Sequence, residues 1–175
     1  MNTWVRRCVY IAVATLTAGC GPRTYTPSTA AEKSAYASIS DAYGVMDSGY
    51  AQNKIDIVWS YRLPGYTCTT KEGQVRDPEQ AKSLTQFKMF GANTIGTTST
   101  IRDMRVKGDK AVVEVLERCE KTTKVPDNMP RMLGLPAPGS RVHSVEVTRA
   151  RDHWVETRQG WFLSRRVVID GNGMQ

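Results

Sequence analysis

Two long stretches in the second half of the chain alternate hydrophobic and polar residues, which is the pattern of β-strands with one buried face. In the stretch Thr97–Thr123 the alternation breaks at Lys107-Gly108-Asp109-Lys110. In the stretch Arg141–Asp170 it breaks at Arg158-Gln159-Gly160. Glycine in a short polar segment between alternating runs is typical of a hairpin turn. The pattern therefore predicts four long antiparallel strands, and their sheet needs a cover over one face.

The first half of the chain has helical periodicity that can supply this cover. Thr29 and Glu32 have the spacing of a capping box, so they predict the start of a first helix. Its apolar residues recur on one face of the helix, and Gly49 is the predicted C-cap. The stripe consists of Tyr36, Ile39, Tyr43 and Met46.

Two shorter helices follow, with β-prone residues between them. Asn53 is the predicted cap of the second helix, and Pro64-Gly65 ends it. Short strands are expected near 66–70 and 74–76. The third helix is predicted to begin after Asp77, with Pro78 as its first residue. The residues expected to face inward from it are Ala81, Leu84 and Phe87.

The first twenty residues resemble a bacterial lipoprotein signal. Arg6 and Arg7 precede an apolar run too short to cross a bilayer, and small residues lead up to Cys20. The resemblance implies cleavage before Cys20, lipidation of its thiol, and a protein anchored in the cell envelope at the outer membrane, facing the periplasm. The alternative is an ordinary secretory signal. The predicted division is residues 1–19 as signal, 20–31 as flexible tether, 32–170 as the domain and 171–175 as a tail.

The order of helix, helix, short hairpin, helix and four long strands resembles a nuclear transport factor 2-like domain of the SnoaL-like and ketosteroid-isomerase-like kind. The segments that carry the resemblance are TCTTKEG, TTSTIRDMRVKGDKAVVEV and ARDHWVETRQGWFLSRR. The resemblance covers nearly the whole domain. It implies an α+β cone in which three N-terminal helices pack on a strongly curved, mostly antiparallel sheet, with a pocket between helices and sheet.

The resemblance to steroid isomerases implies only part of a catalytic site. Asp152 falls on the aspartate of a late strand, which is kept protonated in those enzymes, themselves a standard example of pKa tuning. The position of the catalytic base falls at about Thr70, which cannot take up a proton near neutral pH. The position of the first-helix tyrosine falls near Ala42, with Tyr43 one residue away. Isomerase chemistry is therefore not expected.

Alternation along the third long strand places Asp152 on one face together with Glu146, Thr148 and Trp154. The weak catalytic candidates are Asp152, Tyr43 and Glu146. The bland alternative is a buried Asp152 satisfied by backbone donors and a Glu146 paired with an arginine. Tryptophan and phenylalanine side chains are expected in the core, with one or two at the rim of the pocket. The predicted ligand-binding residues are Tyr43, Trp59, Phe87, Glu146, Thr148, Asp152 and Trp154.

The remaining chemistry-bearing residues narrow the function further. Cys68 and Cys119 are either a disulfide or two buried thiols. His143 and His153 are too far apart to share a metal, so neither a metal nor a cofactor is expected. The formal net charge is +7, but the basic residues are scattered, so a nucleic-acid partner is not expected.

The proline-rich connection at residues 124–141 departs from the compact pattern. It is interpreted as a lid, as a contact for a partner or the membrane, or as an ordinary insertion. The sequence favours a lipid-anchored module that captures a small molecule or an envelope protein. The alternative is an isomerase, cyclase or dehydratase that uses Asp152 with Tyr43 or Glu146. A homodimer formed through the exposed sheet face is compatible with either.

Overall fold

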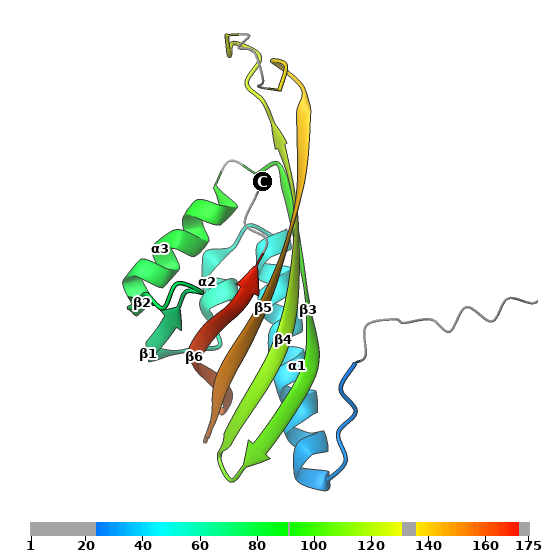
Figure 1. Ribbon diagram of the computed structural model, residues 1–175, viewed down its shortest axis with the longest axis vertical. Helices are drawn as coiled ribbons and strands as arrows, with labels where there is room; N and C mark the ends of the chain where they lie inside the picture. Colours follow the sequence, from blue (N-terminus) through cyan, green and yellow to red (C-terminus); the bar gives the residue numbers. More distant parts are fainter. Residues whose placement is uncertain (1–23, 91, 131–135, 172–175) are drawn as a thin grey trace, which may run out of the picture.

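The computed structural model describes residues 24–90, 92–130 and 136–171, and the predicted signal with Cys20 lies outside them. Three helices precede four long strands, and two short strands lie between the second and third helices (Figure 1). This α+β order confirms the predicted fold class. The elements are α1 Ala30–Ala51, α2 Ile55–Trp59, β1 Arg62–Thr69, β2 Val75–Arg76, α3 Pro78–Met89, β3 Thr94–Lys107, β4 Lys110–Lys124, β5 Arg141–Thr157 and β6 Gly160–Gly171.

The strands form one sheet in the order β2-β1-β6-β5-β4-β3. All neighbours are antiparallel except β1 and β6, which are parallel. Both predicted hairpins are confirmed, since Lys107 pairs with Lys110 and Thr157 pairs with Gly160. Gly160 has φ 121, a backbone conformation that only glycine adopts readily. The sheet curves around α1, which lies behind β3 and β4 in Figure 1.

Helix α1 begins with the predicted capping box, in which the Thr29 side chain accepts from the Glu32 backbone N–H. Ile39, Tyr43 and Met46 of its apolar stripe are buried in the core, and Tyr36 is partly buried beside them. The helix continues past Gly49 to Ala51, so the predicted C-cap at Gly49 is wrong. Glycine is needed there because α2 crosses the helix at this point. A Cβ on Gly49 would lie 2.7 Å from the backbone nitrogen of Val58.

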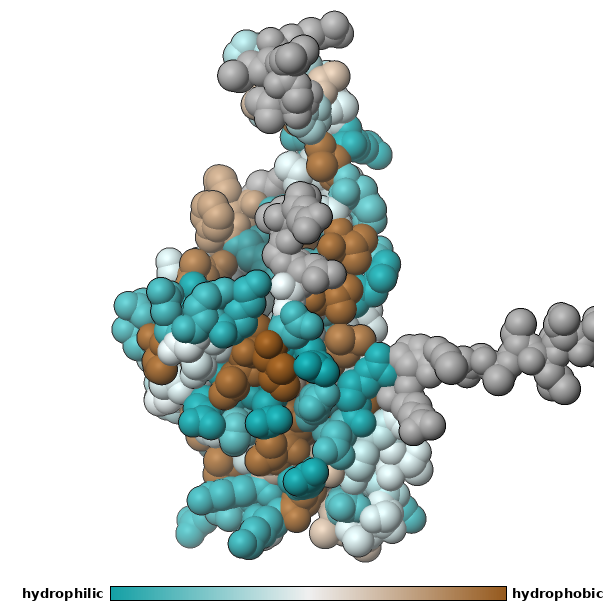
Figure 2. Space-filling model, viewed as in Figure 1, coloured by the Kyte–Doolittle hydropathy of each residue, from teal (hydrophilic) through white to brown (hydrophobic). Residues whose placement is uncertain are grey.

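Helix α3 also begins with the predicted capping box, at Asp77. The expectation that Phe87 faces inward is wrong, because the residue is 76% exposed, whereas Leu84 is 43% exposed but lines the cavity beneath the helix. Phe90, expected in the core, is 80% exposed. Helix α3 contacts β1, β2 and α2 along one narrow side, which Ala81 and Met89 fill. Figure 2 shows hydrophobic atoms on the surface at the end of α3 that is nearer the β4–β5 hairpin.

The far end of the β4–β5 hairpin extends beyond α3 and the other strands (Figure 1). Its backbone pairing continues past the strands, since the Val125 N–H donates to the Ser140 carbonyl at 2.8 Å. Residues 131–135 lie outside the described residues, so the proposed roles of the 124–141 connection stay predictions. Ahead of α1, Tyr25 packs against Tyr36 with ring centroids 6.0 Å apart.

Candidate functional site

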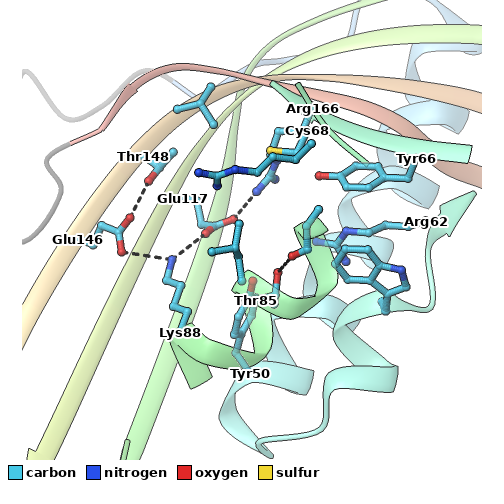
Figure 3. Close-up of a pocket in the computed structure, with 15 residues that line it drawn as sticks. Tyr50, Arg62, Tyr66, Cys68, Thr85, Lys88, Glu117, Glu146, Thr148 and Arg166 are labelled. Atoms are coloured by element: carbon cyan, nitrogen blue, oxygen red, sulfur yellow. Dashed lines mark hydrogen bonds and ion pairs between the residues drawn. The ribbon is translucent and has the colours of Figure 1, made fainter. Parts of the chain in front are cut away.

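A cavity of about 200 Å³ lies between α3, β1 and the inner faces of β4, β5 and β6 (Figure 3). Its walls combine three aromatic side chains with charged groups of both signs. The aromatic side chains are Tyr50, Trp59 and Tyr66. The charged side chains are Arg62, Arg76, Lys88 and Arg166 on the positive side and Glu117 and Glu146 on the negative side.

Arg166 on β6 joins the cavity to the core beneath it. Its guanidinium donates from two nitrogens to the two carboxylate oxygens of Asp152, each at 2.8 Å. A third nitrogen donates to Glu117 at 2.8 Å. Only 12% of the Arg166 side chain is exposed. Burial alone would lower the pKa of Arg166, but the two carboxylates raise it well above its ordinary value. Arg166 is therefore a fixed cation that already has two anionic partners.

Asp152 lies behind this guanidinium and is fully buried. The Tyr43 hydroxyl donates to it at 2.6 Å, and the Trp154 indole N–H donates to that hydroxyl at 3.3 Å. Burial, followed by the nearby Asp152 charge, raises the pKa of Tyr43 well above its ordinary value. Asp152 thus has side-chain partners at both oxygens, and these partners, not backbone donors, satisfy it. No part of its carboxylate is exposed to a ligand.

Lys88 on α3 connects the two carboxylates of the cavity. Its ammonium lies 3.6 Å from Glu117 and 3.3 Å from Glu146. Burial would raise the pKa of Glu117, but the charges of Arg166 and Lys88 outweigh this effect and lower it to about 2. Thr148 adds a long 3.5 Å contact to Glu146. Glu117 therefore stays ionised at neutral pH and is a weak base.

Arg62 on β1 is held by an aromatic corner. Its guanidinium carbon lies 4.4 Å from the centre of the Trp59 ring and 5.3 Å from that of Tyr66, which is cation–π geometry. One terminal nitrogen donates to the Val58 carbonyl. The buried Nε has no hydrogen-bond partner among the described residues. Of the cavity's cations, Arg62 is bound chiefly by neutral groups.

The structure separates the predicted ligand-binding residues into three places. Trp59, Glu146 and Thr148 line the cavity. A second group is buried behind Arg166 and consists of Tyr43, Asp152 and Trp154. Phe87 lies outside, on the solvent side of α3. Of the weak catalytic candidates, the structure brings Asp152 and Tyr43 together and places Glu146 apart from them.

The other residues singled out in the sequence have structural surroundings. Thr70 accepts from the Gln74 N–H in the turn between β1 and β2, and Ala42 is buried in the core. Cys68, beside the cavity, and Cys119, in the core, are free thiols, so the disulfide alternative is not what the structure contains. Within the described residues no group of three or more His, Cys, Asp or Glu could hold a metal ion.

Four residues of the charged network were missed in the sequence, namely Arg62, Lys88, Glu117 and Arg166. Glu117 had a usable signal, because alternation from the buried Val113 and Val115 places it on the inner face. No sequence signal pointed to Arg166. Leu163 faces inward, so strict alternation would place Arg165 on the inner face as well. However, β6 has a register shift opposite His153 and Trp154. Arg165 is consequently exposed and Arg166 faces the cavity.

The chain is similar to known proteins in its fold alone. No protein-family model and no curated protein matches the chain. A nuclear transport factor 2-like superfamily protein from Salmonella enterica superposes with a TM-score of 0.59 at 14% identity, covering 81% of this chain and 93% of that one. The fold is therefore the nuclear transport factor 2-like fold, as the sequence resemblance implied.

Two solved structures with the same fold carry enzyme names. A hexachlorocyclohexane dehydrochlorinase superposes with a TM-score of 0.57 at 14% identity, covering 82% of this chain and 88% of that one. An inferred scytalone dehydratase from Novosphingobium aromaticivorans gives 0.61 at 9% identity, covering 80% and 85%. At these identities the comparison establishes the fold and leaves activity to be argued from the cavity.

Proposed function

We propose that this protein captures a small molecule in the cavity under α3 and does not convert it. The observation that carries this proposal is the pairing of the acidic groups. Both carboxylates that line the cavity contact Lys88, and Glu117 also binds Arg166. The carboxylate beneath them, Asp152, is buried under Arg166 and Tyr43. A general base needs a free lone pair within reach of the substrate, and these groups already have cationic partners.

The histidines support the same conclusion. The side chains of His143 and His153 lie on the outer face of β5, away from the cavity. His143 contacts Thr122, and His153 contacts Arg165. Neither lines the cavity. Neutral histidine is the commonest general base near pH 7. Among the carboxylates and histidines of the described residues, the candidate proton acceptor for the cavity is therefore Glu146 released from Lys88.

We further propose that the protein acts from the surface of a membrane, held by a lipid on Cys20 at the outer membrane and facing the periplasm. The support is the sequence of the first twenty residues, with its arginine pair, apolar run and small residues before Cys20. Among the described residues, no helix has the length and apolar character needed to cross a bilayer.

The second candidate function is a lyase of the dehydratase type. It is favoured by the enzyme names of structures that share the fold. In this protein such chemistry would need Glu146 as the base, since its ion pair with Lys88 is the most exposed part of the network, with 31% of the Glu146 side chain accessible.

Native mass spectrometry of the full chain, extracted from membranes in mild detergent, tests the binding function. We expect the protein to retain a small molecule whose mass does not change during incubation. The same spectrum should show the added mass of the lipid on the chain, and it reports the oligomeric state. Turnover of an added ligand by the wild type, abolished in Glu146→Gln with the fold intact, would establish the enzyme instead. The absence of any bound or bindable molecule would overturn the capture function.

A further inference from the structure

The charges around the cavity are unequal. Four cationic side chains and two carboxylates line it, and the buried Asp152 adds a third negative charge. The side chains that line the cavity, taken together with Asp152, therefore carry one net positive charge. A partly buried charge is unfavourable unless a partner compensates it. The cavity therefore lacks an anion.

Two of the cations form no ion pair or hydrogen bond with a carboxylate among the described residues. Arg166 and Lys88 share the three carboxylates between them. Arg62 contacts rings, a carbonyl and a sulfur, and its buried Nε has no acceptor. Arg76 makes no hydrogen bond or ion pair with another described residue, although it is half-buried and lines both the cavity and the adjoining surface groove. Arg62 and Arg76 are thus the donors available to a ligand.

The remaining walls suit a small aromatic or apolar body. Trp59, Tyr50 and Tyr66 line the cavity together with the apolar side chains of Leu84 and Val168. Cavities that bind drug-sized ligands have about 300–1,000 Å³, whereas this one has about 200 Å³. The ligand is therefore smaller than a typical drug.

Resting on the capture function proposed above, we infer that the ligand is a small organic carboxylate, bound through Arg62 and Arg76 with its apolar part against Trp59. Arginine matches a carboxylate with two parallel N–H donors, and neither Arg62 nor Arg76 forms an ion pair with a carboxylate among the described residues. Neutral molecules leave this charge uncompensated, and cationic molecules add to it. The cavity therefore selects anions over neutral and cationic molecules of the same shape.

Three probes of similar shape separate charge from fit: benzoate, neutral benzamide and cationic benzamidine. The full chain is titrated with each by calorimetry, with the thermal shift as a second readout. We expect benzoate to bind at least about tenfold more tightly than benzamide, as the loss of one charge-assisted hydrogen bond implies. Benzamidine is expected to give no shift.

Two variants test whether the preference for benzoate comes from the cavity. Arg76→Gln removes a side chain that makes no hydrogen bond or ion pair with another described residue, so we expect the free protein to keep its melting temperature while benzoate affinity falls about tenfold. Arg151→Gln is the matched control, because Arg151 is exposed on β5 and lies outside the cavity lining. It should leave benzoate affinity unchanged.

The outcomes separate this inference from the capture function. Equal or tighter binding of benzamide or benzamidine would overturn the carboxylate assignment and leave capture standing. An Arg76→Gln variant that binds benzoate as the wild type does would also overturn it. If none of the three probes binds, the carboxylate assignment fails, and the mass spectrum of the protein extracted from membranes decides capture by itself.

Discussion

Two regions on the inner side of the sheet differ in how their charged side chains are partnered. Around α1 the core is largely apolar, and Asp152 is fully enclosed there with its partners. Under α3 the charged side chains converge on an open cavity, and Arg62 still has an unpaired donor atom. Arg166 belongs to both regions. The comparison teaches that Asp152, at the position the resemblance implies for a catalytic aspartate, is enclosed by its partners, whereas the open charged cavity lies on the other side of Arg166.

The largest expected effect comes from the enclosed region. Asp152→Asn leaves the Arg166 guanidinium buried with one carboxylate fewer, and breaking a buried ion pair costs about 3–5 kcal/mol. Urea unfolding should show this loss. The exposed pair Asp103 and Arg105 supplies a control, and Asp103→Asn should change stability by less than about 1 kcal/mol.

A double variant tests whether Asp152 and Arg166 act as a unit. Arg166→Gln removes the cation that Asp152→Asn leaves behind, so the double variant should be less destabilised than the sum of the two single variants. Additive losses would contradict the arrangement in which Arg166 couples the core to the cavity. A stable Asp152→Asn variant would remove the reason for calling the group structural.

The next largest effect is the dependence of stability on pH that Glu117, in the cavity wall, should cause. The pKa of Glu117 is about 2 in the folded protein and 4.5 ordinarily, so the unfolded chain takes up the proton first as the pH falls. The stability from Glu117 is present above pH 4.5 and is lost as the pH falls towards 2. A shift of this size corresponds to roughly 3 kcal/mol.

Comparison with Glu117→Gln isolates this contribution. The stability difference between wild type and variant, measured by denaturant unfolding, should shrink from about 3 kcal/mol at pH 6 to near zero at pH 2. Glu156→Gln, an exposed change at the other end of β5, should follow the wild-type curve. A difference that stays constant with pH would contradict the pairing of Glu117 with Arg166 and Lys88.

The close contact between Gly49 on α1 and the backbone of α2 links the two regions, and disturbing it should cause an intermediate loss of stability. A Cβ on Gly49 would meet the Val58 backbone, so Gly49→Ala must push α2 away from α1. The Val58 carbonyl holds Arg62, and Trp59 lines the cavity. We expect a loss of about 1–3 kcal/mol in unfolding free energy.

The control for this change lies on the same helix. A Cβ added to Gly44 would have nothing within 4 Å. Gly44→Ala should therefore stabilise α1 by up to about 1 kcal/mol, since alanine is the better helix former. Equal effects of the two substitutions would show that the α1–α2 contact is not close.

Local signals in the sequence predicted most of the fold. The capping boxes at Thr29 and Asp77 and both hairpin turns depend on residues a few positions apart, so a single sequence contains them. Gly49 was misassigned because its need for glycine comes from α2, a contact between elements. Structure that depends on residues close together in the sequence could be predicted, and contacts between distant helices and strands could not.

The candidate site was only partly predictable for the same reason. Alternation placed Glu146 and Thr148 beside the cavity, and it could have placed Glu117 there. The register shift in β6 exchanges the faces of Arg165 and Arg166, and no residue type marks that shift. The charged network therefore becomes visible only when β4, β6 and α3 are brought together.

The smallest expected effect tests the corrected position of α3. Phe87 was predicted to face a ligand, but it is 76% exposed. Phe87→Ala should change the free energy of unfolding by less than about 0.5 kcal/mol, because it removes few buried contacts. Benzoate binding should also be unchanged. Met89, on the buried side of the same helix, is the contrast, and Met89→Ala should destabilise the protein by about 2–5 kcal/mol, since it removes buried contacts and leaves a void. A large loss of stability or affinity in Phe87→Ala would mean that α3 packs on the sheet through its other face.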